Sequence, residues 1–178
     1  MKTLTSADSL SLFRLLAALP SAWYVAQSRW LPASILIALA MLSDFLDGPL
    51  ARRIGTASTR GGLLDHSCDA IFVTCVLAAM AMTGIVPVLL PVLVAFSFTQ
   101  YVLDSRALSG QQLRTSLLGR NNGIAYFVLL GACAFPNVFS PGLIPQAWLG
   151  AAAWLLIVST ALSMFDRLWT LLKLREVL

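Results

Sequence analysis

Four aspartates fall close together in this 178-residue chain, at the facing ends of two apolar segments. They are Asp44, Asp47, Asp65 and Asp69. Carboxylates gathered in one pocket repel one another, and a divalent cation relieves that repulsion. Ligands that are all oxygen suit Mg²⁺, Mn²⁺ or Ca²⁺ better than zinc. These residues therefore predict a site for a hard divalent cation.

The spacing places the aspartates on two helix faces. At about 100° per residue, positions three, four and seven or eight apart share a face. One such face holds Asp44, Asp47, Gly48 and Ala51, and the next holds Gly61, Asp65 and Asp69. Because the turn 53–60 is short, we expect the two helices to be antiparallel neighbours whose acidic faces meet. The glycines leave space where a substrate can approach the backbone.

A simpler interpretation is that the acids form interfacial salt bridges with Arg52, Arg53 and Arg60. It is adequate for any single acid. Four acids on two matched faces favour the metal site, because ionisable groups inside a membrane protein normally face its interior and mark function.

The composition indicates the elements that must position these residues. The chain is 58% apolar and 11% charged, whereas soluble domains are about 45–50% apolar and about 25% charged. A soluble globular protein and a disordered chain are both disfavoured. The net charge is +4, but no basic run is longer than Arg52-Arg53. The basic excess therefore indicates lipid rather than nucleic acid.

A helix needs about 20 apolar residues to cross a bilayer. Six segments qualify, and they cover about 9–27, 31–53, 61–82, 86–103, 122–135 and 147–172. We predict one domain over residues 1–178, an all-α integral membrane protein with a bundle of six transmembrane helices. The fifth segment is short for a span and could reach further back along the chain. Cys68, Cys75 and Cys133 lie in apolar stretches and are expected to be small buried hydrophobes.

The basic residues predict the orientation of the bundle. Eleven of the twelve fall at the termini, the 2–3 and 4–5 connections, or helix ends beside them: Lys2, Arg14, Arg52, Arg53, Arg60, Arg106, Arg114, Arg120, Arg167, Lys173 and Arg175. Only Arg29 falls on the other side. Both termini should therefore be cytoplasmic. A cleaved signal peptide is the alternative for the first helix, but Lys2 is a thin positive region and Arg14 interrupts the apolar stretch.

The acidic pattern resembles the complete signature of the CDP-alcohol phosphatidyltransferase family. It reads Asp44-x2-Asp47-Gly48-x2-Ala51-Arg52-x8-Gly61-x3-Asp65-x3-Asp69. Six helices in a chain of this size are similar to the family's bacterial members, among them phosphatidylglycerophosphate synthases. The segment 10–14, Leu-Ser-Leu-Phe-Arg, with Pro20 is similar to a weaker pattern near the start of these enzymes.

The resemblance implies a metal-dependent transferase of phospholipid synthesis in a membrane, expected to be the bacterial inner membrane. It would transfer a phosphatidyl group from CDP-diacylglycerol to a polar alcohol at a cytoplasmic site and release CMP. Asp44, Asp47 and Asp65 would bind Mg²⁺ or Mn²⁺, expected as two ions. Asp69 would be the general base for the acceptor hydroxyl, and could also contact a metal. The CDP pocket would be lined by Gly48, Ala51, Arg52 and Gly61. Family members are often homodimers.

Two features depart from the phosphatidylglycerophosphate synthase pattern. Pro49 lies inside the signature, where a kink or an early helix end is expected. The residues 65–69, Asp-His-Ser-Cys-Asp, are similar to the Asp-His-Gly-Cys-Asp of choline and ethanolamine phosphotransferases, which use CDP-choline or CDP-ethanolamine with diacylglycerol. His66 could be a second base or a substrate contact, although a hydrogen-bonded helix residue is the simpler interpretation.

Three arginines and the size of the chain bear on the identity of the acceptor alcohol. Arg106, Arg114 and Arg120 could hold the phosphate of glycerol 3-phosphate or inositol phosphate, or could set topology and contact anionic lipid. The size of the chain favours glycerol 3-phosphate. From other classes, a cation transporter would place its acids near the midplane rather than at one end. An intramembrane prenyltransferase usually has its two acidic motifs far apart in a longer chain.

Overall fold

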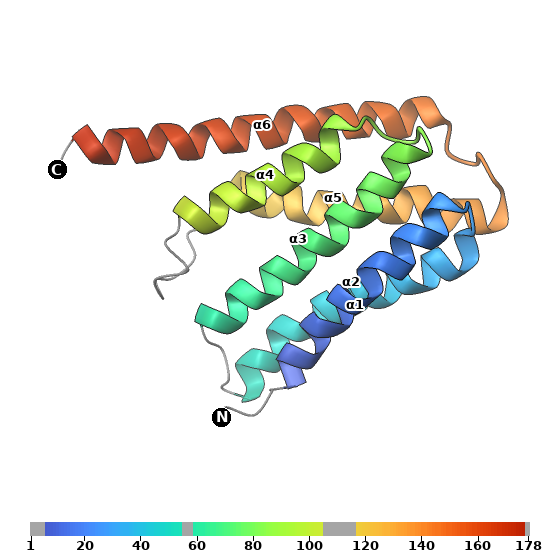
Figure 1. Ribbon diagram of the computed structural model, residues 1–178, viewed down its shortest axis with the longest axis horizontal. Coiled ribbons are helices and arrows are strands. Elements are labelled where there is room, and N and C mark those ends of the chain that lie inside the picture. Colours follow the sequence, from blue (N-terminus) through green and yellow to red (C-terminus); the bar gives the residue numbers. More distant parts are fainter. Residues whose placement is uncertain (1–5, 55–58, 105–116, 177–178) are drawn as a thin grey trace.

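The structure, a computed structural model, describes the backbone of residues 6–54, 59–104 and 117–176, with side chains over 10–45, 61–103 and 117–170. The described part is helical throughout (Figure 1), with α1 (Ser6–Ala26), α2 (Trp30–Ile54), α3 (Thr59–Met82), α4 (Leu89–Asp104), α5 (Leu117–Phe139) and α6 (Gln146–Glu176). The predicted all-α chain of six helices is confirmed over these residues.

Several helix boundaries differ from the prediction by three to five residues, among them the start of α4, both ends of α5 and the end of α6. α5 is 23 residues long instead of the short segment expected at 122–135, because Leu117 to Asn121 extend its start and Pro136 to Phe139 extend its end. α4 begins at Leu89 rather than near 86, because Pro87 lies in the preceding turn, where its carbonyl accepts the Leu90 N–H at 3.0 Å. α2 continues to Ile54, close to the predicted end at 53, so of the kink or early helix end expected at Pro49 the early end does not occur.

The turns that end α1 and α3 have the same construction. At the first, Ser28 has φ 54°. The Ser28 N–H donates to the Val25 carbonyl, and the Arg29 N–H donates to the Tyr24 carbonyl. At the second, Gly84 has φ 76°, and the Ile85 N–H donates to the Met80 carbonyl. This is the left-handed cap that satisfies the last carbonyls of a helix. It reverses the chain at the ends of these helices.

The first helix is the main neighbour of both acid-bearing helices. In the described residues α1 packs more extensively against α3 and α2 than against any other helix, and α2 otherwise packs mainly on α5. Over the described residues α2 and α3 pack on α1 more than on each other, and their acids Asp44, Asp65 and Asp69 meet at an α1 residue, Arg14. Buried Ala17, Ala18 and Ser21 on α1 permit this, since small side chains let helix backbones approach closely.

The outward faces of the bundle are apolar. Three helical stretches are long and apolar enough to cross a membrane: Gly61–Met82, Leu117–Phe139 and Gln146–Thr170. Three shorter apolar stretches accompany them: Leu10–Ala26, Trp30–Phe45 and Leu89–Leu103. Large apolar side chains such as Leu19, Phe45 and Phe96 are exposed, as expected where lipid replaces water. The cysteines are free in the described part, and Cys68 and Cys133 are buried as predicted.

Candidate active site

Three aspartates from two helices converge on one arginine of a third helix. Arg14 Nη1 on α1 lies 2.9 Å from Asp44 Oδ1 on α2 and also pairs with Asp69 Oδ1 on α3. Arg14 Nη2 pairs with Asp65 Oδ1. The arginine side chain is 0% exposed, whereas Asp65 and Asp69 are 26% and 22% exposed. The acids therefore form the wall between a buried cation and more open space.

The position of Arg14 is the main feature that the sequence analysis missed. From the sequence, Arg14 was an orientation residue, an interruption of the first apolar stretch and part of the 10–14 pattern, whereas the possible partners of the acids were Arg52, Arg53 and Arg60. The place of Arg14 inside an apolar helix was the sign that it pairs with an acid, since a buried charge must be paired. Ser11, one turn earlier, adds to the same contact by donating from Oγ to Asp65 Oδ1 at 3.2 Å.

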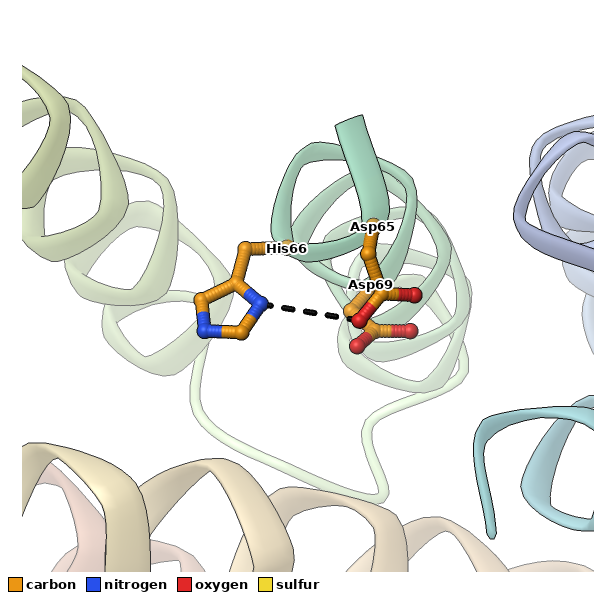
Figure 2. Close-up of side chains that lie close together, drawn as sticks. All are labelled: Asp65, His66 and Asp69. Atoms are coloured by element: carbon orange, nitrogen blue, oxygen red, sulfur yellow. Dashed lines mark ion pairs between the residues drawn. The ribbon is translucent and has the colours of Figure 1, made fainter. Parts of the chain in front are cut away.

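The next side chain of the cluster is His66, on the helix that carries Asp65 and Asp69. Figure 2 shows the two carboxylates beside each other, with the imidazole directed to one side of α3. His66 Nδ1 lies 3.7 Å from Asp65 Oδ2, which is longer than a hydrogen bond. The expected hydrogen-bonded helix residue is thus not what this geometry gives. The ring instead stacks on Tyr101 of α4, with centroids 5.8 Å apart.

The chemistry of this cluster fits a divalent cation. Asp65, His66 and Asp69 each offer a ligand atom, and these atoms lie within 4.8 Å of one another. Three carboxylates against one guanidinium leave two negative charges, which one divalent ion would neutralise. Carboxylate oxygens suit Mg²⁺ and Mn²⁺.

The aspartates open onto a cavity of about 300 Å³ between the helices. Its acidic wall is Asp44, Asp65 and Asp69, and Arg120 from α5 and Arg167 from α6 also line it. The guanidinium of Arg167 lies 4.6 Å from the centre of the Tyr101 ring, in cation–π geometry. Because Tyr101 in turn stacks on His66, two rings separate Arg167 from the acids. The cavity thus combines an acidic wall with a basic one.

Polar contacts between α5, α6 and α4 hold the rest of the cavity wall. Ser159 Oγ donates to Asn122 Oδ1 at 2.6 Å, and Tyr126 Oη lies 2.5 Å from Thr160 Oγ1. Gln100 on α4 donates to a carbonyl of α6 at 3.0 Å. Hydrogen bonds between membrane helices are worth about 0.6 to 2 kcal/mol each. These contacts fix the helices that carry the two arginines, and none of the contacts was predicted from the sequence.

The other predicted site residues have the following places. The backbones of Asp47, Gly48, Ala51 and Arg52 belong to α2, and their side chains lie outside the described part. Gly61 lies in the first turn of α3, one turn before Asp65. Arg106 and Arg114 lie outside the described residues. Of the three candidate acceptor arginines, Arg120 is the one that the structure places at the cavity.

Comparison with known proteins decides the family. The model of the family described as CDP-alcohol phosphatidyltransferase matches residues 4–165. This chain belongs to the CDP-alcohol phosphatidyltransferase family. The family match extends over α1 to α5 and most of α6, so it includes Arg14 and both acidic helices. The predicted family, and with it the predicted enzyme class, is confirmed.

A curated relative of this family member comes from rice, Oryza sativa subsp. japonica. It is the chloroplastic CDP-diacylglycerol–glycerol-3-phosphate 3-phosphatidyltransferase 1, which is 41% identical over 58 residues. The matched stretch is 33% of this phosphatidyltransferase-family chain and 18% of the rice protein. The match thus covers less than a fifth of the length of that relative.

Proposed function

We propose that this protein transfers a phosphatidyl group from CDP-diacylglycerol to a small phosphorylated alcohol, with glycerol 3-phosphate as the best candidate, and releases CMP. The observation that carries the proposal is the cavity that joins three convergent aspartates to Arg120 and Arg167. Membership of the family supports the donor and the leaving group. The name of the rice relative supports the acceptor.

Asp69 is proposed as the general base. The acceptor hydroxyl oxygen would attack the phosphorus attached to the diacylglycerol, while Asp69 takes the hydroxyl proton. An oxygen–phosphorus bond forms, and the bond from that phosphorus to the CMP oxygen breaks. A carboxylate within hydrogen-bond reach of the hydroxyl is suited to this task. The place of Asp69 on the cavity wall supports the role.

Asp44, Asp47, Asp65 and Asp69 are proposed to hold one or two Mg²⁺ or Mn²⁺ ions. Divalent ions held there would neutralise the pyrophosphate and stabilise the charge on the leaving oxygen. The net negative charge of the described cluster supports this assignment. We assign Gly48, Ala51, Arg52 and Gly61 to the CDP pocket, on the family signature that they complete.

The two arginines favour an anionic acceptor. A guanidinium offers a planar fork of donors that suits phosphate. In the CDP-choline reaction the acceptor is diacylglycerol, which carries no charge for Arg120 and Arg167 to bind. The cavity therefore favours a phosphorylated alcohol over the CDP-choline reaction suggested by the sequence Asp-His-Ser-Cys-Asp.

The test is an assay of CMP release by the purified protein in detergent. CDP-diacylglycerol and Mn²⁺ would be supplied with glycerol 3-phosphate, inositol phosphate, or the unphosphorylated alcohols. We expect CMP with a phosphorylated acceptor and little with its unphosphorylated counterpart. A parallel reaction would contain CDP-choline and diacylglycerol. CMP from that reaction alone would overturn the proposal, and Mn²⁺-dependent ion flux in liposomes without CMP would indicate a transporter.

Replacing Arg167 with glutamine should weaken acceptor binding. Loss of a hydrogen bond to a charged group costs about 1.5–3 kcal/mol, so KM for glycerol 3-phosphate should rise roughly 10- to 100-fold. KM for CDP-diacylglycerol should change little, and Arg120→Gln should act in the same direction. The matched control is Arg29→Gln, because Arg29 is exposed on the turn after α1. Equal effects of Arg167→Gln on both substrates would contradict an acceptor site.

We also propose that all six helices lie in the bilayer as one domain, with both termini and the site on the cytoplasmic side, and that the enzyme is a homodimer. The basic residues and apolar outer faces support the orientation. In a background with the native cysteines replaced, an impermeant maleimide applied to intact cells should label Ser28→Cys and spare Thr170→Cys. Both positions are exposed, so the reverse pattern would invert the topology. Cross-linking in native membranes tests the dimer.

A further inference from the structure

The acids of the proposed metal site already have a cation of their own. Arg14 is the largest side chain in the described residues that is fully buried. Its two terminal nitrogens contact one oxygen, Oδ1, on each of Asp44, Asp65 and Asp69. A buried arginine is stable only with such partners, since an unpaired charge in a low-dielectric interior is very costly. The arginine and the three acids are therefore mutually dependent.

This contact joins three helices at one point. The acids come from α2 and α3, which pack mainly on α1 rather than on each other in the described part. Ser11 Oγ reaches the same Asp65 oxygen, so two residues of one α1 face hold that carboxylate. Without a cation between them, the carboxylates of α2 and α3 would repel one another. Arg14 thus sets the separation of the two acidic faces.

The guanidinium and a metal ion would compete for the same carboxylates. Both need negatively charged oxygens, but the guanidinium is a planar fork with fixed directions, while Mg²⁺ demands near-octahedral geometry. The closeness of Arg14 also lowers the negative potential that an arriving ion meets. The arginine should therefore stabilise the empty site and weaken metal binding at the same time.

We propose that Arg14 is a positioning residue, an internal counterion that holds Asp44, Asp65 and Asp69 in place until a divalent metal ion binds and partly replaces it. The inference rests on the proposed function only in requiring that these acids bind a metal. It predicts opposite effects of removing Arg14 on the metal-free protein and on metal affinity. A purely structural arginine would not produce that combination.

The experiment compares the wild type with Arg14→Gln, Arg14→Lys and the control Arg29→Gln, each as the full chain in detergent. Tm would be measured in EDTA and in saturating Mn²⁺, and Mn²⁺ affinity by titration of the free-ion electron paramagnetic resonance signal. In EDTA, Arg14→Gln should melt below the wild type, and Mn²⁺ should raise its Tm by more. Its Kd for Mn²⁺ should tighten on the order of tenfold, because a nearby positive charge is gone.

Lysine keeps the positive charge but loses the planar guanidinium, so Arg14→Lys should show smaller changes of the same kind in Tm and in Kd for Mn²⁺. If Arg14→Gln does not fold, Arg14→Lys supplies the comparison with the wild type. An equal fall in Tm with and without Mn²⁺, or unchanged or weaker Mn²⁺ binding by the variants, would overturn the role of Arg14. If the wild type still bound Mn²⁺ and released CMP, the proposed function would survive that result. A wild type that neither binds Mn²⁺ nor releases CMP would refute both proposals.

Discussion

Replacing Asp69 with asparagine should lower the turnover of CMP release by about 10²- to 10⁴-fold, the range that a general base contributes. Asparagine keeps the size of the side chain but cannot take a proton from the acceptor hydroxyl. The rate should not recover at saturating Mn²⁺ or saturating acceptor, because the missing step is proton removal. The measurement is kcat for CMP release from CDP-diacylglycerol at saturating substrates.

The matched control for this variant is Asp166→Asn, because Asp166 is an exposed aspartate of α6 that does not line the cavity. It should leave kcat unchanged. Because Asp69 also pairs with Arg14, Tm must be measured for each variant to separate chemistry from folding. If a folded Asp69→Asn protein retained full turnover, the base would have to be another residue.

Replacing Asp65 with asparagine should act mainly through the metal. Residues that hydrogen-bond to a metal ligand contribute about 10- to 100-fold to metal affinity or activity. Loss of a ligand itself should therefore raise the Mn²⁺ concentration for half-maximal activity by at least about 100-fold. Activity should partly return at high Mn²⁺, because other carboxylates of the cluster remain. The measurement is CMP release as a function of free Mn²⁺.

The contrast between the two variants is the decisive result. Rescue by Mn²⁺ for Asp65→Asn and not for Asp69→Asn would separate a ligand from a base. Rescue of both would make Asp69 primarily a ligand. No rescue of Asp65→Asn, with Mn²⁺ binding unchanged in direct titration, would exclude Asp65 from the metal site.

The local part of the site could be predicted from the chain. Asp65 and Asp69 are four residues apart on one helix, and helical periodicity alone places them on one face. The same reasoning placed Asp44 near the end of the preceding helix, and its side chain does join theirs. The six apolar segments were also evident, because each must bury or expose a long apolar surface as a unit. Their ends were less certain, as the extra turns of α5 show.

The signature determined the family, and the spacing of its aspartates determined which helix faces carry acids. Tertiary structure decided what those faces meet: α1 packs against both α2 and α3, and its buried Arg14 pairs with Asp44, Asp65 and Asp69. It also brought Arg120 and Arg167 to the cavity of Asp65, although they come from α5 and α6. The physical reason is that a helix repeats every 3.6 residues, so sequence fixes neighbours within one helix. The packing of one helix on another depends on how small, long and charged side chains fit together, and these side chains come from positions far apart in the sequence.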